Sequence, residues 1–145
     1  MTYWDTSALL KLYVVEPDSP YFLQLIANTD EQIVTSAIAE TEFLCALHRK
    51  EHAGDLKPGA AKAVFRKFTA DAKAGRIVTI PYGADVVAEA EKLVRLAFDQ
   101  PQPVMLRSLD VIHVSTALAS KAGTLVATDT RLRTLATLAR LKVRP

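Results

Sequence analysis

Two aspartates of this 145-residue chain stand at the ends of predicted β-strands. Asp5 closes a short strand predicted for residues 2–5, and Asp129 comes just after a strand predicted for residues 124–127. In an open sheet of parallel strands, ligands collect beyond the carboxyl ends of the strands, so both acids lie where a binding site is expected. Each aspartate also precedes a predicted helix, and aspartate is a favoured helix N-cap. Capping is therefore the structural alternative for each of them taken singly.

Asp110 lies in a predicted helix, residues 109–121, that is otherwise strongly apolar. Such a helix leaves scarcely any charged face on which a carboxylate could be solvated, and a buried carboxylate needs a partner. The available partners are a bound cation, Arg107, or His113, which stands one turn further along the same helix. An acid at this position indicates either a salt bridge or a metal site.

A fourth acid comes from the helix predicted for residues 37–52, where Glu40 and Glu42 are both candidates. Both fall in the first turns of the helix, where the helix dipole favours acidic residues. Both also have apolar neighbours at helical spacing, so periodicity does not separate them. The residues alone leave the choice between Glu40 and Glu42 open.

Several carboxylates that converge without a cation repel one another and raise each other's pKa values. Their convergence would therefore imply a bound metal ion. Carboxylate oxygens suit hard cations, and the chain has no clear histidine or thiolate set, with Cys45 as its single cysteine. This donor chemistry points to Mg²⁺ or Mn²⁺ in preference to zinc, and the reaction that fits it is phosphodiester hydrolysis.

Short β-branched runs alternate with helical segments along the chain, which is typical of a parallel sheet covered on both faces. Strands are predicted at residues 2–5, 32–35, 76–80, 124–127 and 141–143. Helices are predicted at residues 7–14, 21–27, 37–52 with Ser36 as its cap, from Pro58 to near Gly75, at 84–98, at 109–121 and from Thr130. The predicted fold class is α/β.

Length and composition predict a single domain over residues 1–145, because two separate cores of half this length would each be marginal. The chain shows no secretory signal and no apolar run long enough to cross a membrane, which predicts a cytoplasmic protein. The formal net charge is only +2, but the last fifteen residues hold only basic charges, on Arg131, Arg133, Arg140, Lys142 and Arg144. Next to a phosphodiester site, such a segment could contact a polyanion.

Four sequence blocks carry the candidate acids, in an order that spans almost the whole chain. The blocks are Asp5-Thr6-Ser7-Ala8-Leu9-Leu10-Lys11, then Thr35-Ser36 followed by Glu42-Phe43-Leu44, then Leu106-Arg107-Ser108-Leu109-Asp110-Val111-Ile112-His113, and finally Ala127-Thr128-Asp129-Thr130-Arg131-Leu132. This pattern resembles the PIN-domain ribonucleases, and specifically the VapC-type toxins of bacterial toxin–antitoxin pairs.

The resemblance implies both a site and an architecture. It selects Glu42 as the second acid. The other implied site residues are the remaining acids and the neighbouring hydroxyls, which would orient carboxylates or water: Asp5, Asp110, Asp129, Thr6, Ser7 and Thr128. The implied architecture is a three-layer α/β/α fold with a central parallel sheet of about five strands. A homodimer is also implied, as is a VapB-type antitoxin with a segment in the active-site groove.

The function that follows is a Mg²⁺- or Mn²⁺-dependent ribonuclease that acts as the toxin of such a pair. Arg107, Arg131 and Arg133 are candidates for holding the backbone of the RNA substrate. The alternative function is a PIN-like module that keeps the fold and binds RNA or a protein without cutting. The presence of all four acids weighs against this alternative, and removal of the metal separates the two functions.

Overall fold

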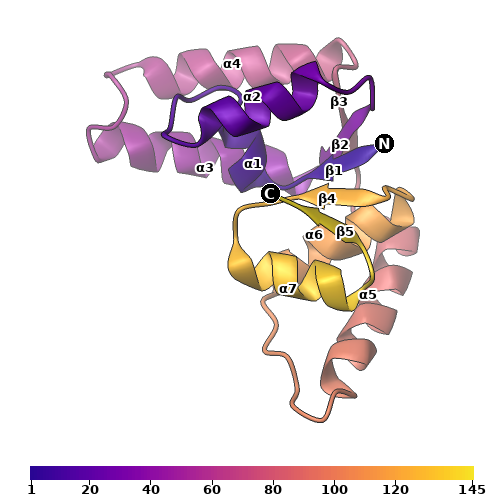
Figure 1. Ribbon diagram of the computed structural model, residues 1–145. Coiled ribbons are helices and arrows are strands. Elements are labelled where there is room, and N and C mark those ends of the chain that lie inside the picture. The colour runs from indigo at the N-terminus through magenta and orange to yellow at the C-terminus, as the bar shows by residue number, and fades with distance from the viewer.

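The computed structural model describes all 145 residues and shows a five-stranded sheet with helices packed on both of its faces (Figure 1). The strands are β1 (Thr2–Trp4), β2 (Ile33–Ser36), β3 (Ile77–Ile80), β4 (Thr124–Val126) and β5 (Lys142–Arg144). The helices are α1 (Thr6–Leu10), α2 (Ser19–Ala27), α3 (Ile38–His52), α4 (Ala60–Lys73), α5 (Ala84–Phe98), α6 (Ser108–Ala119) and α7 (Thr130–Leu138). The three-layer α/β/α fold expected from the sequence is confirmed.

All strand pairs of the sheet are parallel, and the strand order is β3-β2-β1-β4-β5. β1 therefore lies in the centre, between β2 and β4. The chain proceeds outwards from β1 to β3 in one direction and from β4 to β5 in the other, so the order reverses between β1 and β4. Such a switch point opens a crevice at the carboxyl ends of the central strands, where open α/β sheets bind their ligands.

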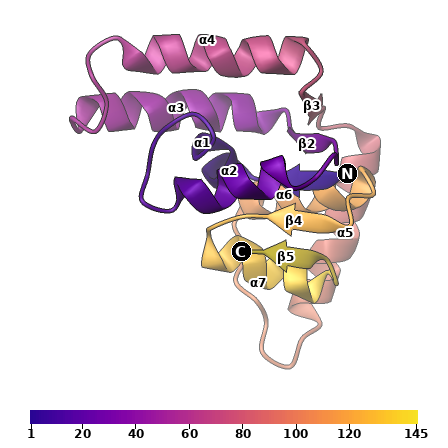
Figure 2. The same cartoon turned by 45° about the horizontal axis from the view of Figure 1, so that its top comes forward.

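The alternation of side chains along the central strands divides the core into two. Tyr3 and Leu125 pack with residues of α5, α6 and α7, whereas Trp4 and Val126 pack with residues of α1, α2, α3 and α4. The same division is visible in Figures 1 and 2, where α1–α4 and α5–α7 lie on opposite sides of the sheet. Because both faces are covered, the strands consist of short and largely apolar runs.

Helices α3 and α4 run side by side and extend beyond the sheet (Figure 2). The rings of Phe43 and Phe68 stack between them, with centroids 4.5 Å apart and planes inclined by 16°. Tyr13 packs edge-on against both rings, at 5.5 and 5.9 Å. Aromatic pairs of this kind add about 0.5 to 1.5 kcal/mol beyond the area that they bury. This packing fixes the position of α3, which carries Glu42 next to Phe43.

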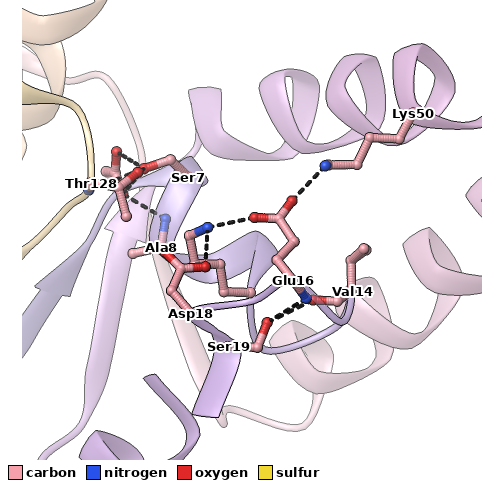
Figure 3. Close-up of polar contacts among 10 residues, drawn as sticks. Ser7, Ala8, Val14, Glu16, Asp18, Ser19, Lys50 and Thr128 are labelled. Atoms are coloured by element: carbon pink, nitrogen blue, oxygen red, sulfur yellow. Dashed lines mark hydrogen bonds and ion pairs between the residues drawn. The ribbon is translucent and has the colours of Figure 1, made fainter. Parts of the chain in front are cut away.

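The first helix is shorter than the sequence predicted. α1 ends at Leu10 instead of Val14, and the following residues form turns. Glu16 anchors this segment, because it pairs with Lys11 and its Oε1 lies 2.5 Å from Nζ of Lys50 in α3 (Figure 3). The contact between Glu16 and Lys50 joins two distant parts of the chain, so helical periodicity could not reveal it.

Ser36 was predicted to cap α3; the N-cap lies one residue later, although Ser36 Oγ accepts a hydrogen bond from the Ile38 N–H at 3.4 Å. Ser36 is the last residue of β2, where it pairs with Ile80 of β3, and Ala37 occupies the cap position. Pairing with β3 therefore extends β2 by one residue beyond its predicted end. The other elements begin and end within a few residues of their predicted limits. None of the helices is both long enough and apolar enough to span a membrane.

Candidate active site

The predicted acids meet at the switch point of the sheet. Asp5 directly follows β1, and Asp129 follows the neighbouring strand β4. The Asp5 N–H donates to the Val126 carbonyl at 3.0 Å, which continues the pairing of the two strands up to the acid. Glu42 comes from α3 on one face of the sheet and Asp110 from α6 on the other. The carboxylates therefore converge from two strand ends and from helices of both outer layers.

Asp5 is both a helix cap and a member of the candidate site. Its Oδ1 accepts a hydrogen bond from the Ala8 N–H at 2.8 Å, and Ser7 Oγ lies 2.9 and 2.7 Å from its two carboxylate oxygens. Only 4% of Asp5 is exposed. Burial raises the pKa of Asp5, and the hydrogen bonds from Ala8 and Ser7 offset only part of this rise. A cation next to Asp5 would favour its charged form.

Two hydroxyl groups connect Asp5 to the end of β4. Thr128 Oγ1 donates to Ser7 Oγ at 2.7 Å, so that the Ser7 proton is free to point to Asp5. Figure 3 shows the side chains of Ser7 and Thr128 facing each other. The structure thus places both predicted hydroxyls where they orient the Asp5 carboxylate.

Glu42 lies in the second turn of α3, and its Oε2 is held from two sides. Thr6 Oγ1 donates to this oxygen at 2.6 Å, and His113 Nε2 lies 2.6 Å from it. Burial raises the pKa of Glu42, but the hydrogen bonds from His113 and from the Thr6 hydroxyl outweigh burial and hold this pKa below its ordinary value. Glu40 does not line the pocket, so the structure favours Glu42 over Glu40.

Asp110 and Asp129 are less restrained by the chain. Asp110 lies in the first turn of α6 and is half-buried, less than the apolar helix suggested. It has no ion-pair or hydrogen-bond partner, so the considered salt bridge with Arg107 or His113 is not formed. Burial and the negative charge of Asp129 raise the pKa of Asp110, and Arg107 offsets part of this rise. Asp129 caps α7, where its Oδ1 accepts from the N–H groups of Arg131 and Leu132 at 2.8 and 3.1 Å.

His113 has a different partner from the one considered from the sequence. The spacing along α6 suggested Asp110, but His113 Nε2 contacts Glu42 and its Nδ1 lies 2.6 Å from Tyr3 Oη. Tyr3 was not assigned to the site at all, because an aromatic residue in a central strand is typical of the core. No sequence signal distinguishes this tyrosine, since its contact with His113 joins residues 110 positions apart.

The four acids line a single pocket of about 390 Å³. The polar residues that share this lining are Thr6, Ser7, Ser108, His113, Arg49 and Arg107. Arg49 was missed in the sequence, although it follows Glu42 by seven residues on the same helix. This spacing is two helical turns, and it is the signal that could have found Arg49.

The structure divides the three arginines that were predicted to hold RNA. Arg107 immediately precedes α6 and lines the pocket with the acids. Arg131 lies outside the lining, yet its charge acts to lower the pKa of Asp110. Arg133 lies elsewhere, because its Nη2 donates to the carbonyl of Pro145 at 2.8 Å. Arg107 therefore belongs to the pocket, Arg131 lies near it, and Arg133 is outside it.

The oxygen atoms that line the pocket are of the chemical type that binds a hard divalent cation. They are carboxylate and hydroxyl oxygens, and the one histidine already has both ring nitrogens engaged, by Tyr3 and Glu42. As the side chains lie, no three acidic, histidine or cysteine side chains come close enough together to hold an ion. Burial nevertheless raises the pKa values of Asp5 and Asp110, and a bound cation would stabilise their ionised forms.

The chain has a parallel α/β/α fold, and four acidic side chains line one pocket at its central switch point. The family model of the PIN domain matches residues 2–138. The chain is therefore a member of the PIN domain family, which is a family of nucleases. No curated protein matches the chain by sequence.

Solved structures share this fold over nearly the whole chain. The crystal structure of FitAcB from Neisseria gonorrhoeae has a TM-score of 0.73 at 18% identity, covering 100% of this chain and 97% of that chain. VapBC2 from Rickettsia felis, bound to a DNA fragment from its promoter, has a TM-score of 0.67 at 18% identity, covering 99% and 98%. VapBC-1 from nontypeable Haemophilus influenzae has a TM-score of 0.69 at 15% identity, covering 99% and 97%. At such identities the similarity is one of fold.

Proposed function

We propose that the chain, as a single PIN domain over residues 1–145, is a Mg²⁺- or Mn²⁺-dependent ribonuclease and the toxin of a toxin–antitoxin pair. The observation that carries the proposal is the gathering of Asp5, Glu42, Asp110 and Asp129 in one pocket. These acids would hold a divalent cation, which when bound would supply an activated water and charge neutralisation at the scissile phosphate. Membership of a nuclease family supports the reaction class.

The hydroxyls of the site orient the carboxylates in this proposal. Thr6 holds Glu42 through the 2.6 Å hydrogen bond to Oε2. Ser7 holds Asp5 and is itself fixed by Thr128, through hydrogen bonds of 2.7 Å each. Residues that orient metal ligands in this way typically contribute a factor of about 10 to 100 in metal affinity or activity.

The arginines of the pocket hold the phosphate backbone of the RNA in this proposal. Arg49 and Arg107 reach the pocket from different elements and are the only arginine or lysine side chains in its lining. Arg131 near the pocket adds to the positive field around Asp110. Arg133 has the least support, because its guanidinium group is bonded to the carboxyl-terminal residue. Contacts of this type provide affinity without sequence specificity.

The proposed partner is a VapB-type antitoxin with a segment that occupies the pocket. The similarity in fold to FitAcB and to the VapBC complexes supports this part of the proposal. A homodimer and a cytoplasmic location complete the proposal. Size-exclusion chromatography with light scattering tests the homodimer, and a monomer at micromolar concentration would contradict it.

The decisive experiment incubates the purified full-length chain, free of any antitoxin, with a mixed RNA pool in Mg²⁺ or Mn²⁺. Glu42→Gln and Glu40→Gln form a matched pair of variants, because both acids lie on α3 and only Glu42 lines the pocket. We expect cleavage that stops in EDTA and falls by on the order of 100-fold or more in Glu42→Gln. Glu40→Gln should cleave at the wild-type rate.

Three outcomes would contradict the proposal. Cleavage that persists in EDTA excludes the metal, and equal losses in the two glutamate variants exclude the specific role of Glu42. RNA binding without any cleavage, unchanged by EDTA, would instead support the alternative of a PIN-like binding module.

A further inference from the structure

A buried row of hydrogen bonds runs from the centre of the sheet to Glu42. Tyr3 of β1 is fully buried, and its Oη lies 2.6 Å from Nδ1 of His113. His113 of α6 is 4% exposed, and its Nε2 lies 2.6 Å from Oε2 of Glu42 in α3. The backbone N–H of Ser36 donates to the same Tyr3 Oη at 3.1 Å. Two neighbouring strands, β1 and β2, and one helix from each outer layer thus contribute to the row.

The donors and acceptors in this row have one consistent order. The Ser36 N–H can only donate, so it occupies an acceptor position of Tyr3 Oη. In a neutral His113 ring, whose Nε2 faces the Glu42 carboxylate, the phenol proton then points to the free Nδ1. Nδ1 of His113 then accepts, and Nε2 carries the ring proton that it donates to Glu42.

Both contacts to Glu42 end on the same carboxylate oxygen. Thr6 Oγ1 and His113 Nε2 bond to Oε2, and no hydrogen bond from the chain reaches Oε1. Asp5 differs, because both of its oxygens lie within hydrogen-bonding distance of Ser7 Oγ. A carboxylate that two donors hold by one oxygen is restricted in rotation, and its other oxygen remains available as a ligand.

We propose that His113 is a positioning residue, which Tyr3 locks in its Nε2–H tautomer so that it holds Oε2 of Glu42 and leaves Oε1 for a divalent cation. The inference rests on the proposed role of Glu42 as a metal ligand. It adds that the core of the sheet, through Tyr3, determines the orientation of this ligand.

The tautomer of His113 is the first test, measured in the full-length protein by long-range ¹H–¹⁵N NMR of its histidine side chains. The other two histidines, His48 and His52, are exposed and serve as references for exchanging tautomers. We expect a pure Nε2–H ring for His113 and a mixture of tautomers in Tyr3→Phe. A predominantly Nδ1–H ring in the wild-type protein would overturn the proposal. This measurement requires neither metal nor RNA.

Two matched substitutions form the second test. Glutamine places its terminal amide nitrogen near the position of Nε2, whereas asparagine places its amide near Nδ1. We therefore expect His113→Gln to bind Mn²⁺ within a few-fold of the wild-type affinity, and His113→Asn to bind it about 10- to 100-fold more weakly. Calorimetric titration with Mn²⁺ measures this difference, and circular dichroism verifies the fold. Equal losses in the two folded variants would overturn the positioning role.

Mn²⁺ binding and RNA cleavage separate this inference from the proposed function. Mn²⁺ binding that depends on His113 in a protein that cuts no RNA would contradict the nuclease proposal and support the positioning role. RNA cleavage together with an unchanged Mn²⁺ affinity in His113→Asn would support the nuclease proposal and contradict the positioning role.

Discussion

The two halves of the acidic pocket are built differently. Asp5 and Glu42, the anchored pair, accept hydrogen bonds from other side chains: Asp5 from Ser7, and Glu42 from Thr6 and His113. Asp110 and Asp129, the open pair, have no such support: Asp110 has no partner, and Asp129 bonds only to the backbone of its own helix. The fold alone therefore orients the anchored pair, whereas in the open pair the charge of Asp129 raises the pKa of Asp110 and no side chain hydrogen-bonds to either carboxylate.

The pKa values express the same difference between the two halves. The His113 contact and the Thr6 hydroxyl outweigh burial and lower the pKa of Glu42, so the ionised form is stabilised before any ligand arrives. Burial and the charge of Asp129 raise the pKa of Asp110, so its ionised form is destabilised. Asp5 is anchored but also the most deeply buried of the acids, and its pKa is raised. Hydrogen bonds thus orient Asp5 without fully replacing its lost solvation.

The largest expected effect comes from Asp5→Asn, which removes the charge of the most deeply buried anchored acid. Asparagine caps helices as well as aspartate, so the fold should survive. We expect the rate of RNA cleavage to fall by about 1,000-fold or more, because a ligand of the proposed metal site is removed. Gel-based cleavage rates and circular dichroism measure the two quantities. A folded variant with nearly wild-type cleavage would remove Asp5 from the chemistry.

Ser7→Ala tests whether the hydroxyls orient the anchored pair. It removes the donor to Asp5 and the acceptor for Thr128, and we expect Mn²⁺ affinity and cleavage to fall by about 10- to 100-fold. Ser108→Ala is the matched control, because Ser108 lines the same pocket without contacting Asp5. Calorimetric titration measures both variants. Similar affinities in the two would show that the anchored pair needs no orienting hydroxyl.

Opposite changes in stability are expected when each half loses a charge in the metal-free protein. Glu42→Gln weakens the contacts with Thr6 and His113, so the free energy of unfolding should fall by about 1 kcal/mol. Asp110→Asn relieves repulsion from Asp129 and should raise the free energy of unfolding by at most about 0.5 kcal/mol, since Asp110 is partly exposed to solvent. Urea unfolding at neutral pH in EDTA measures both changes. Destabilisation by Asp110→Asn would contradict the claim that ionised Asp110 destabilises the metal-free fold.

The pH dependence of these two changes sharpens the same comparison. The pKa of Asp110 is raised, so ionised Asp110 destabilises the fold at neutral pH, and this penalty disappears below its ordinary value of 3.8. The pKa of Glu42 is lowered, so its contribution is present above its ordinary value of 4.5 and is lost as the pH falls through the folded value. In acid, both variants should approach the stability of the wild-type protein. Asp110→Asn should lose its excess stability, and Glu42→Gln should lose its deficit. Urea midpoints between pH 7 and pH 3 provide the measurement.

The smallest expected effect concerns the arginines. Arg107→Ala should reduce the slope of log affinity against log salt concentration by about 0.7 for each phosphate of single-stranded RNA that the protein no longer neutralises. Arg133→Ala should leave the slope unchanged, because Arg133 lies outside the pocket and bonds to Pro145. Binding to a cleavage-resistant RNA in EDTA-containing buffers of increasing salt gives both slopes. Equal slopes for the two variants would show that Arg107 does not contact the RNA backbone.

The class of fold and part of the site were already predictable from the amino-acid order. Alternation of short apolar runs with helical segments predicted the α/β architecture, because each period depends on a few neighbouring residues. Asp5 and Asp129 could be placed at the site for a similar local reason, since they end or follow strands that a parallel sheet brings together. The capping alternative for both was also correct, and one carboxylate serves both purposes.

The resemblance already selected Glu42, but the hydrogen-bond partners of the site residues were decided only in the tertiary structure. Glu42 is distinguished from Glu40 by Thr6 and His113, which lie 36 and 71 positions away from it in the chain. Neither contact follows from helical spacing on α3 or α6. Likewise, Arg49 enters the pocket and Arg133 does not, although both are arginines on helices. The physical reason is that these contacts depend on which elements become neighbours across the sheet, and local periodicity carries no information about that arrangement.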